Sequence, residues 1–358
     1  MAYRSQLRQT LHYLARPRTP SPRAPVGGAA AWRAGELAAR RDWEIQLSPD
    51  EARELVDAVA RARERRRPLR ELVAADFPLP TLRARIPVWR NELAHGRGVV
   101  VLRGVPVERL TQEESEHLFW GLGLHLGIPG AQNPKGDLLG HVVDEGRDSQ
   151  TEVRAYRTRT RIAFHCDAAD VVGLLCLHQA PVGGRSLIAS SVAVHDEVLR
   201  RRPDLAPLLY APFLLDTKDE GGVRHFPVIP CSLAGGQLRT FYHADYFRSV
   251  ERHADVPRLT AAQRELLDLY DAIAGSPELC VEMDLAPGDV QLLSNHTVIH
   301  GRTAYEDAPG GGWKRHLLRL WLSLPGRDER PGLRGAKLAL LGQLGRARAG
   351  ELVRALRG

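Results

Sequence analysis

The sequence has no uninterrupted apolar run of about 18 residues, the length that a helix needs to cross a bilayer, so we expect no membrane span. Its first residues, Met1 to Arg4, lack the apolar stretch of a secretory signal. Cysteine is scarce, and no Cys-x-x-Cys pair occurs, which is typical of a reducing compartment and not of a disulfide scaffold. We therefore expect a cytoplasmic location. The four cysteines are Cys166, Cys176, Cys231 and Cys280.

Positive charge is concentrated in the first part of the chain. The net charge of all 358 residues is +7, whereas residues 1–100 hold 19 arginines, no lysine and 11 acidic residues, a net charge of +8. The arginine-rich run over 61–67 has the charge to contact phosphate backbones. No aromatic residues interleave with these arginines, and a solvated helix face explains them more simply. Nucleic acid is therefore not the expected partner.

The first 95 residues are interpreted as an extension followed by a helical segment. Prolines and a Gly-Gly pair predict that residues 1–31 form a flexible basic extension. A capping box that starts at Ser48 predicts a helix, and a second helix is expected over about 82–94, interrupted by Pro87. Residues 32–95 are therefore predicted to form a helical segment packed on the core.

Short strand-like runs dominate from residue 96 onward. Two helices interrupt them, one over about 192–201 and one that begins at Thr260. Many short strands with Gly and Pro punctuation predict a mainly β domain with flanking helices (α+β) over residues 96–325. A helical tail is predicted over residues 326–358. The expected strands include 99–102, 171–177, 186–190, 281–285, 290–293 and 317–322.

Two histidines and an aspartate are candidate metal ligands. His165 and Asp167 are two residues apart, so on an extended strand they share one side of the sheet. His300 ends the apolar run 297–299 and can approach from another strand. Two imidazoles and one carboxylate hold Fe(II) on one face and leave other positions open. The chain has 14 histidines, so on these three residues alone an ordinary surface or core role stays open.

Two arginines follow the second candidate histidine. Beyond the turn-rich segment 306–312, Arg315 and Arg319 lie on one face of the expected returning strand. A buried guanidinium needs an anion, and its planar fork matches a carboxylate. A surface ion pair with Glu306 or Asp307 is an equally good interpretation of the spacing.

Further motifs make the pattern specific, and this ordered set resembles the taurine dioxygenase/TfdA superfamily of Fe(II)- and 2-oxoglutarate-dependent oxygenases, including its clavaminate-synthase-like branch. The resemblance covers about residues 95–325. It implies a double-stranded β-helix core, the jelly-roll or cupin-like fold. The motifs are Phe164-His165-Cys166-Asp167, Gly183-Gly184-Arg185-Ser186, Pro287-Gly288-Asp289-Val290, His300-Gly301-Arg302-Thr303 and Arg315-His316-Leu317-Leu318-Arg319.

The resemblance also implies individual roles. It implies that Fe(II) is held by His165, Asp167 and His300 and reacts with O2. The co-substrate is then 2-oxoglutarate, whose far carboxylate meets Arg315. Ser186 matches the motif residue, often threonine, that helps to hold this co-substrate. Arg319 matches a second arginine that is often turned towards the substrate.

Residues that contact the substrate are expected in the segment before His165, where this family builds the lid of its pocket. Each candidate has a solvated loop residue as the alternative interpretation. If either acidic candidate faces the iron, charge complementarity predicts an amine or guanidine substrate. The candidates are Gln132, Asn133, Asp144, Glu145 and Tyr156.

The expected activity is that of a 2-oxoglutarate-dependent dioxygenase. It would hydroxylate a C–H bond of a small amino-acid-like or natural-product intermediate and release succinate and CO2. Desaturation, cyclisation or epimerisation at the same iron centre is the first alternative. A basic nucleic-acid-binding protein with a vestigial jelly roll is a distant one. The expected partner is a small-molecule substrate, and the sequence leaves a homo-oligomer open.

Overall fold

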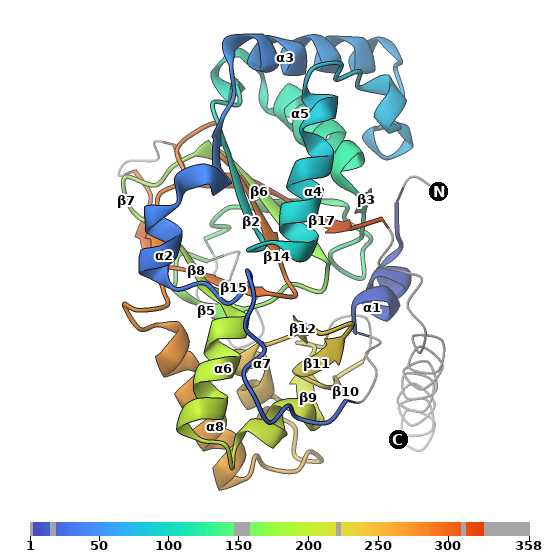
Figure 1. Ribbon diagram of the computed structural model, residues 1–358. Helices are drawn as coiled ribbons and strands as arrows, with labels where there is room; N and C mark the ends of the chain where they lie inside the picture. The colour runs from blue at the N-terminus through green and yellow to red at the C-terminus, as the bar shows by residue number, and fades with distance from the viewer. Residues whose placement is uncertain (1–2, 15–18, 147–157, 220–222, 309–312, 326–358) are drawn as a thin grey trace, which may run out of the picture.

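Two larger β-sheets, three two-stranded sheets and the helices outside them form the described part of the molecule (Figure 1). The computed structural model describes residues 3–14, 19–146, 158–219, 223–308 and 313–325. Helices α3, α4 and α5 gather at one end of the view, and α6 and α8 at the opposite end. No helix among the described residues combines the length and the apolar character needed to cross a bilayer.

The larger sheet has seven strands, and only its β1–β2 pair is parallel. Neighbouring strands are far apart in the sequence, which is the crossover pattern of a jelly roll. The predicted mainly β, jelly-roll fold is therefore confirmed. The strand order is β1 (Glu44–Gln46), β2 (Val99–Arg103), β14 (Val290–Ser294), β6 (Val171–His178), β17 (His316–Ser323) and β3 (Ile128–Pro129), and β4 (Leu139–Val142) also pairs with β17.

The smaller sheet has four antiparallel strands and carries the candidate metal ligands. Its order is β13 (Val281–Met283), β8 (Ser186–Ser190), β15 (Val298–Arg302) and β5 (Ile162–His165). A short pair, β7 (Val182–Gly183) and β16 (Tyr305–Glu306), lies next to β8 and β15 in the sequence.

Apolar side chains from both sheets meet in the layer between them. Val172 and Leu293 of the larger sheet belong to one buried cluster with Ile188 and Val298 of the smaller sheet. Along β17, Leu317 and Trp321 join this inner cluster, whereas Leu318, Leu320 and Leu322 join the cluster under the helices. The alternation along β17 therefore turns Arg319 towards the layer between the sheets, as the sequence predicts.

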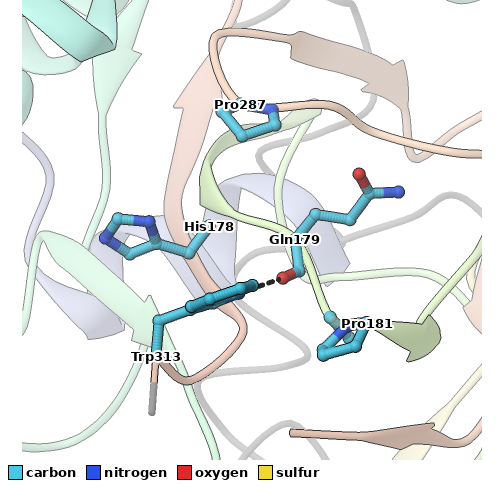
Figure 2. Close-up of a pocket in the computed structure, with 6 residues that line it drawn as sticks. His178, Gln179, Pro181, Pro287 and Trp313 are labelled. Carbon is cyan, nitrogen blue, oxygen red and sulfur yellow. Dashed lines mark hydrogen bonds between the residues drawn. The ribbon is translucent and has the colours of Figure 1, made fainter. Parts of the chain in front are cut away.

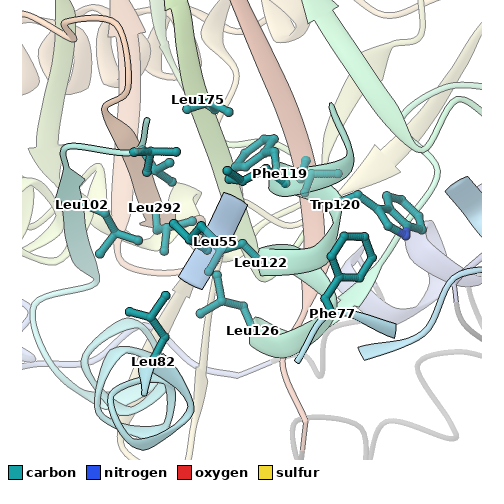
Figure 3. Packing of buried hydrophobic residues seen from close by; sticks show 14 of the residues in the cluster. Leu55, Phe77, Leu82, Leu102, Phe119, Trp120, Leu122, Leu126, Leu175 and Leu292 are labelled. Atoms are coloured by element: carbon teal, nitrogen blue, oxygen red, sulfur yellow. The ribbon is translucent and has the colours of Figure 1, made fainter. Parts of the chain in front are cut away.

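Helices α3 (Pro49–Glu64), α4 (Ile86–His95) and α5 (Gln112–Leu126) cover the outer face of the larger sheet. Leucines and aromatic residues of these helices and the turns beside them pack on Leu102, Leu175 and Leu292 (Figure 3). The predicted capping box at Ser48 is present, since the backbone N–H of Glu51 donates to Ser48 Oγ. The helix predicted over residues 82–94 is shorter than expected, because residues 82–84 form a separate 3-10 turn and α4 begins at Ile86. Pro87 stands in the first turn of α4, where its missing N–H costs nothing.

The outer face of the smaller sheet packs against α6 (Ser191–Arg201), α7 (Ala244–Ser249) and α8 (Ala261–Ala274). Two hairpins that the sequence analysis did not predict complete this side. They are β9 (Phe213–Asp216) with β10 (His225–Val228), and β11 (Cys231–Ala234) with β12 (Gln237–Thr240). The remaining short elements are α2 (Ala34–Ala39), η1 (Arg41–Trp43), η2 (Leu69–Glu71), η3 (Ala74–Asp76), η4 (Leu82–Ala84), η5 (Val107–Arg109), η7 (Ala206–Tyr210) and η9 (Val250–Arg252).

The start of the chain differs from the flexible extension that the sequence suggested. Residues Gln6–Leu14 form α1, and its Gln9, His12 and Tyr13 are each no more than 2% exposed. These three side chains are spaced i, i+3 and i+4, so they share one helical face. The composition of residues 1–31 is dominated by prolines beyond this helix, which conceals the short buried face.

A histidine pair at the start of β17 makes stability dependent on pH. His316 Nε2 lies 2.9 Å from His141 Nδ1, and His178, the last residue of β6, is the Cα partner of His316. Burial, followed by repulsion from His141 and His178, lowers the pKa of His316 to about 4 from 6.5. Below pH 6.5 the unfolded chain therefore takes up a proton that the folded protein refuses.

We expect this histidine to contribute a loss of folding free energy as the pH falls from 6.5 to about 4, with no further loss below. His316→Gln should make the free energy of unfolding less dependent on pH between 6.5 and about 4. Urea unfolding at a series of pH values measures this free energy. His95→Gln, which changes an exposed histidine on α4, is the matched control. Parallel stability curves for wild type and His316→Gln would contradict the prediction.

Candidate metal centre

Strand pairing brings the two candidate histidines together. His165 is the last residue of β5, and His300 lies in β15 as its Cα partner in the antiparallel ladder. Their ring centroids are 4.3 Å apart. Asp167 follows two residues after His165, and its Oδ2 is 3.8 Å from His300 Nε2. One ligand atom from each of the three side chains lies within 4.8 Å of the other two.

The donor atoms of this cluster are available. His165 Nδ1 donates to the carbonyl of Ala163 at 3.0 Å, which leaves the lone pair of Nε2 free for a metal. Asp167 is only 7% exposed, and within the described residues its buried Oδ2 has no hydrogen-bond partner. An unsatisfied buried carboxylate oxygen is costly, and a cation at this point would satisfy it. The donor set therefore fits a divalent first-row metal.

The charge states of the cluster also suit a metal. Burial, with a further effect from His165, lowers the pKa of His300 to about 3, so its imidazole is neutral at neutral pH. Burial acts to raise the pKa of Asp167, but Arg319 and the two histidines outweigh it and hold the pKa below its usual value. His300 and Asp167 are therefore in the deprotonated forms that bind metals.

Asn295 supports the backbone of the aspartate. Its side-chain oxygen accepts a hydrogen bond from the backbone N–H of Asp167 at 3.0 Å. Its own backbone N–H donates to the carbonyl of Asp170 at 3.0 Å. The sequence places Asn295 five residues before His300, but no spacing rule signalled this contact.

Arg315 is buried just before β17 and is 5% exposed. Its Nη2 donates to the carbonyl of Gly184 at 3.2 Å, and its guanidinium carbon lies 5.2 Å from the ring centroid of Tyr305. Asp307 accepts from the backbone N–H of Arg315, so the structure does not have the surface ion pair that the spacing left open. In the described part of the chain, the buried Nη1 has no hydrogen-bond partner. A carboxylate fits this guanidinium by charge and by donor geometry.

The Gly-Gly motif makes room for this arginine. Gly184 has a φ of +72°, and a Cβ there would lie 2.7 Å from Arg315 Nε. A side chain at position 184 would therefore be strained and would displace the guanidinium. Ser186, on β8, is 5% exposed, and its hydroxyl donates to Gln291 Oε1 at 3.0 Å. The structure places Ser186 beside β15 as the Cα partner of Arg302.

Arg319 reaches from the larger sheet towards the aspartate of the smaller sheet. Its Nη1 is 3.7 Å from Asp167 Oδ1, and its Nε donates to Gln132 Oε1 at 2.7 Å. The amide nitrogen of Gln132 in turn donates to the carbonyl of Arg319 at 2.8 Å. Gln132 therefore orients Arg319, and both of its polar groups already have protein partners.

Among the other candidates for substrate contact, Asn133 and Asp144 have partners in the protein. Asn133 Nδ2 donates to a neighbouring aspartate, and its Oδ1 accepts two backbone N–H groups, so it closes a turn. Asp144 is buried, but its Oδ2 is paired with Arg159 Nε at 3.1 Å. Glu145 is exposed. Tyr156 lies outside the described residues.

His243 lies at the cluster without having been singled out by sequence reasoning. It forms an isolated β-bridge with His165, and the two ring centroids are 5.0 Å apart. Its imidazole stacks on the ring of Tyr246 at 3.6 Å, with 12° between the planes. Both side chains are partly exposed. No motif or short spacing links this histidine to the ligands, because the contact comes from the turn between β12 and α7.

A separate pocket of 480 Å³ opens on the surface near the start of β17 (Figure 2). Trp313 is 61% exposed there, and its Nε1 donates to the carbonyl of Gln179 at 3.2 Å. None of the residues that line it is a candidate metal or co-substrate residue. The lining residues are His178, Gln179, Ala180, Pro181, Pro287 and Trp313.

Comparison with known proteins finds a family whose sequence model matches most of the chain. The sequence model of the family described as "Taurine catabolism dioxygenase TauD, TfdA family" matches residues 65–321. The chain is 33% identical over 311 residues to the FR-33289 synthase of Streptomyces rubellomurinus (strain ATCC 31215). That alignment covers 84% of this chain and 91% of the relative.

Solved structures share the fold. An asparagine oxygenase in complex with Fe(II), 2S,3S-3-hydroxyasparagine and succinate superposes with a TM-score of 0.61. The sequence identity is 18%, and the match covers 81% of this chain and 98% of that one. The non-haem iron oxygenase OrfP, in complex with Fe and alpha-ketoglutaric acid, has a TM-score of 0.58 at 17% identity and covers 78% and 93%. At such identities these likenesses establish the architecture alone.

Proposed function

Because this chain belongs to the TauD, TfdA family and is a non-haem Fe(II)- and 2-oxoglutarate-dependent dioxygenase, we propose that it hydroxylates a C–H bond of an amino-acid-like or natural-product intermediate. The observation that carries this proposal is the convergence of His165, Asp167 and His300 around one point, with a buried carboxylate oxygen left without a partner among the described residues. The products are the oxidised substrate, succinate and CO2.

In this proposal the three side chains are the Fe(II) ligands. When bound, the iron supplies the activation of O2 and the coupled oxidation of 2-oxoglutarate and substrate. Ala163 fixes the orientation of the His165 ring, and Asn295 fixes the backbone of Asp167. Apolar residues between the two sheets exclude water from the inner side of the centre.

Arg315 is proposed to bind the far carboxylate of 2-oxoglutarate. Its burial, the space provided by Gly184 and an Nη1 without a partner among the described residues support this assignment. Burial lowers the pKa of Arg315, yet guanidinium groups keep their proton, so the charge that attracts the carboxylate is retained. Ser186 is proposed to assist after its hydroxyl turns away from Gln291.

The charges at the centre favour a substrate with an anionic group. Arg319, which is held by Gln132 and lies 3.7 Å from Asp167 Oδ1, is proposed to face an acidic group of the substrate. Asp144 already has Arg159 as its partner, which weakens the case for an amine recognised by this carboxylate. Amino acids carry such an anionic group, and the related solved structures contain hydroxyasparagine and hydroxyarginine. We propose that His243 and Tyr246 form part of the substrate side of the centre.

A screen for substrate-stimulated succinate release tests the proposed reaction. Purified protein with Fe(II), 2-oxoglutarate and air is offered amino acids, their N-substituted derivatives and other acidic biosynthetic intermediates. We expect one class to raise succinate release above the uncoupled background and to gain one oxygen by mass. A product that has lost two hydrogens would indicate desaturation or cyclisation in place of hydroxylation. A product of unchanged mass and altered stereochemistry would indicate epimerisation. No Fe(II)-dependent succinate release with any compound would contradict the proposal.

The state of the cysteines bears on the cellular location. All four cysteines are free thiols, and three of them are buried, which is compatible with a reducing compartment. We therefore propose the cytoplasm as the location and a small molecule as the partner.

A further inference from the structure

The N-terminal helix α1 contacts the loop that carries the candidate ligand Asp167. We call residues 166–170, which follow β5, the metal loop. Gln9 Nε2 donates to the carbonyl of Ala168 at 3.0 Å, and His12 Nε2 lies 2.8 Å from Asp170 Oδ2. The side chains of Gln9 and His12 are each no more than 2% exposed. Residues about 158 positions apart in the sequence are thus joined by buried hydrogen bonds.

Asp170 is the centre of these contacts. It is fully buried, and its Oδ1 accepts from His296 Nε2 at 2.6 Å while its Oδ2 accepts from His12 and from the backbone N–H of Leu324 at 2.9 Å. Burial acts to raise the pKa of Asp170, but hydrogen bonds from the two histidines outweigh it and hold the pKa well below its usual value. A buried ionised carboxylate of this kind depends on every one of its donors.

The same helix also reaches the residue that supports Asp167. Tyr13 donates its hydroxyl to the carbonyl of Asn295 at 2.6 Å and lies 3.0 Å from the carbonyl of Thr240. Its ring stacks on His296, with centroids 4.9 Å apart. Asn295 in turn holds the backbone N–H of Asp167 and the carbonyl of Asp170. Both ends of the metal loop are therefore tied to α1 through one or two hydrogen bonds.

We propose that α1 is a positioning element of the metal centre, in which His12 and Tyr13 hold the metal loop so that the Asp167 carboxylate meets His165 and His300. This inference rests on the proposed function, because it requires Asp167 to be a metal ligand. Asp167 stands beyond the end of β5, and its backbone N–H is bound by the side chain of Asn295 and not by a neighbouring strand. Partners that orient a metal ligand typically contribute about 10- to 100-fold to metal affinity.

Cobalt(II) binding by the full-length protein tests the proposal, since cobalt(II) is stable in air and its absorption bands report ligand geometry. We expect His12→Ala to weaken cobalt(II) binding by about 10- to 100-fold and to change these bands. His12→Gln, which keeps a donor, should recover part of the affinity. Tyr13→Phe keeps the ring stack, removes the hydroxyl and should weaken binding to a smaller extent. Arg8→Gln, at an exposed position of the same helix, is the matched control and should bind as the wild type does.

Hydrogen exchange in the metal-free protein supplies a second readout. We expect His12→Ala to accelerate exchange at the amides of Asp167 and Asn295, while amides in β6 and β14 keep their wild-type protection. Uniform acceleration throughout the protein would instead show that the substitution weakens the whole fold. The cobalt(II) affinity of Tyr13→Phe would then decide whether α1 positions the metal loop.

The outcomes separate this inference from the proposed function. Wild-type protein that fails to bind cobalt(II) would overturn the metal assignment and the positioning role together. If wild type binds the metal, and folded His12→Ala and Tyr13→Phe bind it equally tightly with unchanged spectra, only the positioning role of α1 is overturned. Weaker binding in these variants, with partial recovery in His12→Gln, supports it.

Discussion

Replacing Asp167 with alanine is expected to abolish both Fe(II) binding and 2-oxoglutarate-dependent succinate release. The substitution removes the one carboxylate from a cluster of two imidazoles, and with it the negative charge that offsets the metal. Loss of groups that only orient a ligand costs about 10- to 100-fold, so loss of the ligand itself should exceed 100-fold. Calorimetry with Fe(II) under anaerobic conditions and a succinate assay measure the two effects.

Two further variants make this result specific. Asp167→Asn keeps the shape and the backbone contact with Asn295 but removes the charge, so it should lose most of the metal affinity as well. Asp50→Ala removes a largely exposed carboxylate on α3 and should leave both measurements unchanged. Retention of tight Fe(II) binding in a folded Asp167→Ala protein would remove this aspartate from the ligand set.

Replacing Arg315 with alanine is expected to raise the KM for 2-oxoglutarate by about 30-fold or more. Truncating one partner of a buried, hydrogen-bonded charge pair costs about 2 to 5 kcal/mol, and each 1.4 kcal/mol is a factor of ten. The guanidinium is 5% exposed and has one buried N–H group without a partner among the described residues, so a bound carboxylate would meet little competing water. Steady-state succinate release at varied 2-oxoglutarate measures the change.

The choice of co-substrate identifies the group that Arg315 binds. The wild type should strongly prefer 2-oxoglutarate to a 2-oxo acid without the far carboxylate, and Arg315→Ala should lose most of that preference. Arg315→Lys keeps the charge but lacks the planar fork, so we expect an intermediate KM. Arg185→Ala, which removes an exposed arginine of the Gly-Gly motif that is paired with Glu282, is the control. An unchanged preference in Arg315→Ala would assign the far carboxylate to another residue.

Much of the fold could be predicted because local rules govern it. The capping boxes at Ser48 and Thr260 each begin the helix that the sequence predicts, since the cap and the third helical residue are close in the chain. The β-branched run that starts at Val99 forms β2 within one residue of the expected range. The jelly-roll fold and the family were correctly inferred from five ordered motifs.

One error was local, and the others arose where a residue's role depends on distant partners. Pro87 was predicted to interrupt a helix, but the turn before it allows α4 to begin there. Residues 1–31 were predicted to be a flexible extension, yet His12 and Tyr13 of α1 are buried against a loop far along the chain. The hairpins β9–β10 and β11–β12 were not predicted, although the second brings His243 next to His165.

The sequence by itself determined which chemical groups are present and, through the two-residue period of strands, which of them share a side. Along β17, for example, Arg319 shares a side with Leu317 and Trp321, because alternation along a strand is a property of the local backbone. Only the tertiary structure decided which of these groups meet. The register between β5 and β15 sets His165 opposite His300, and the facing of the two sheets brings Arg319 to Asp167. Such pairings depend on packing between segments more than a hundred residues apart, and several registers would satisfy the local pattern equally well.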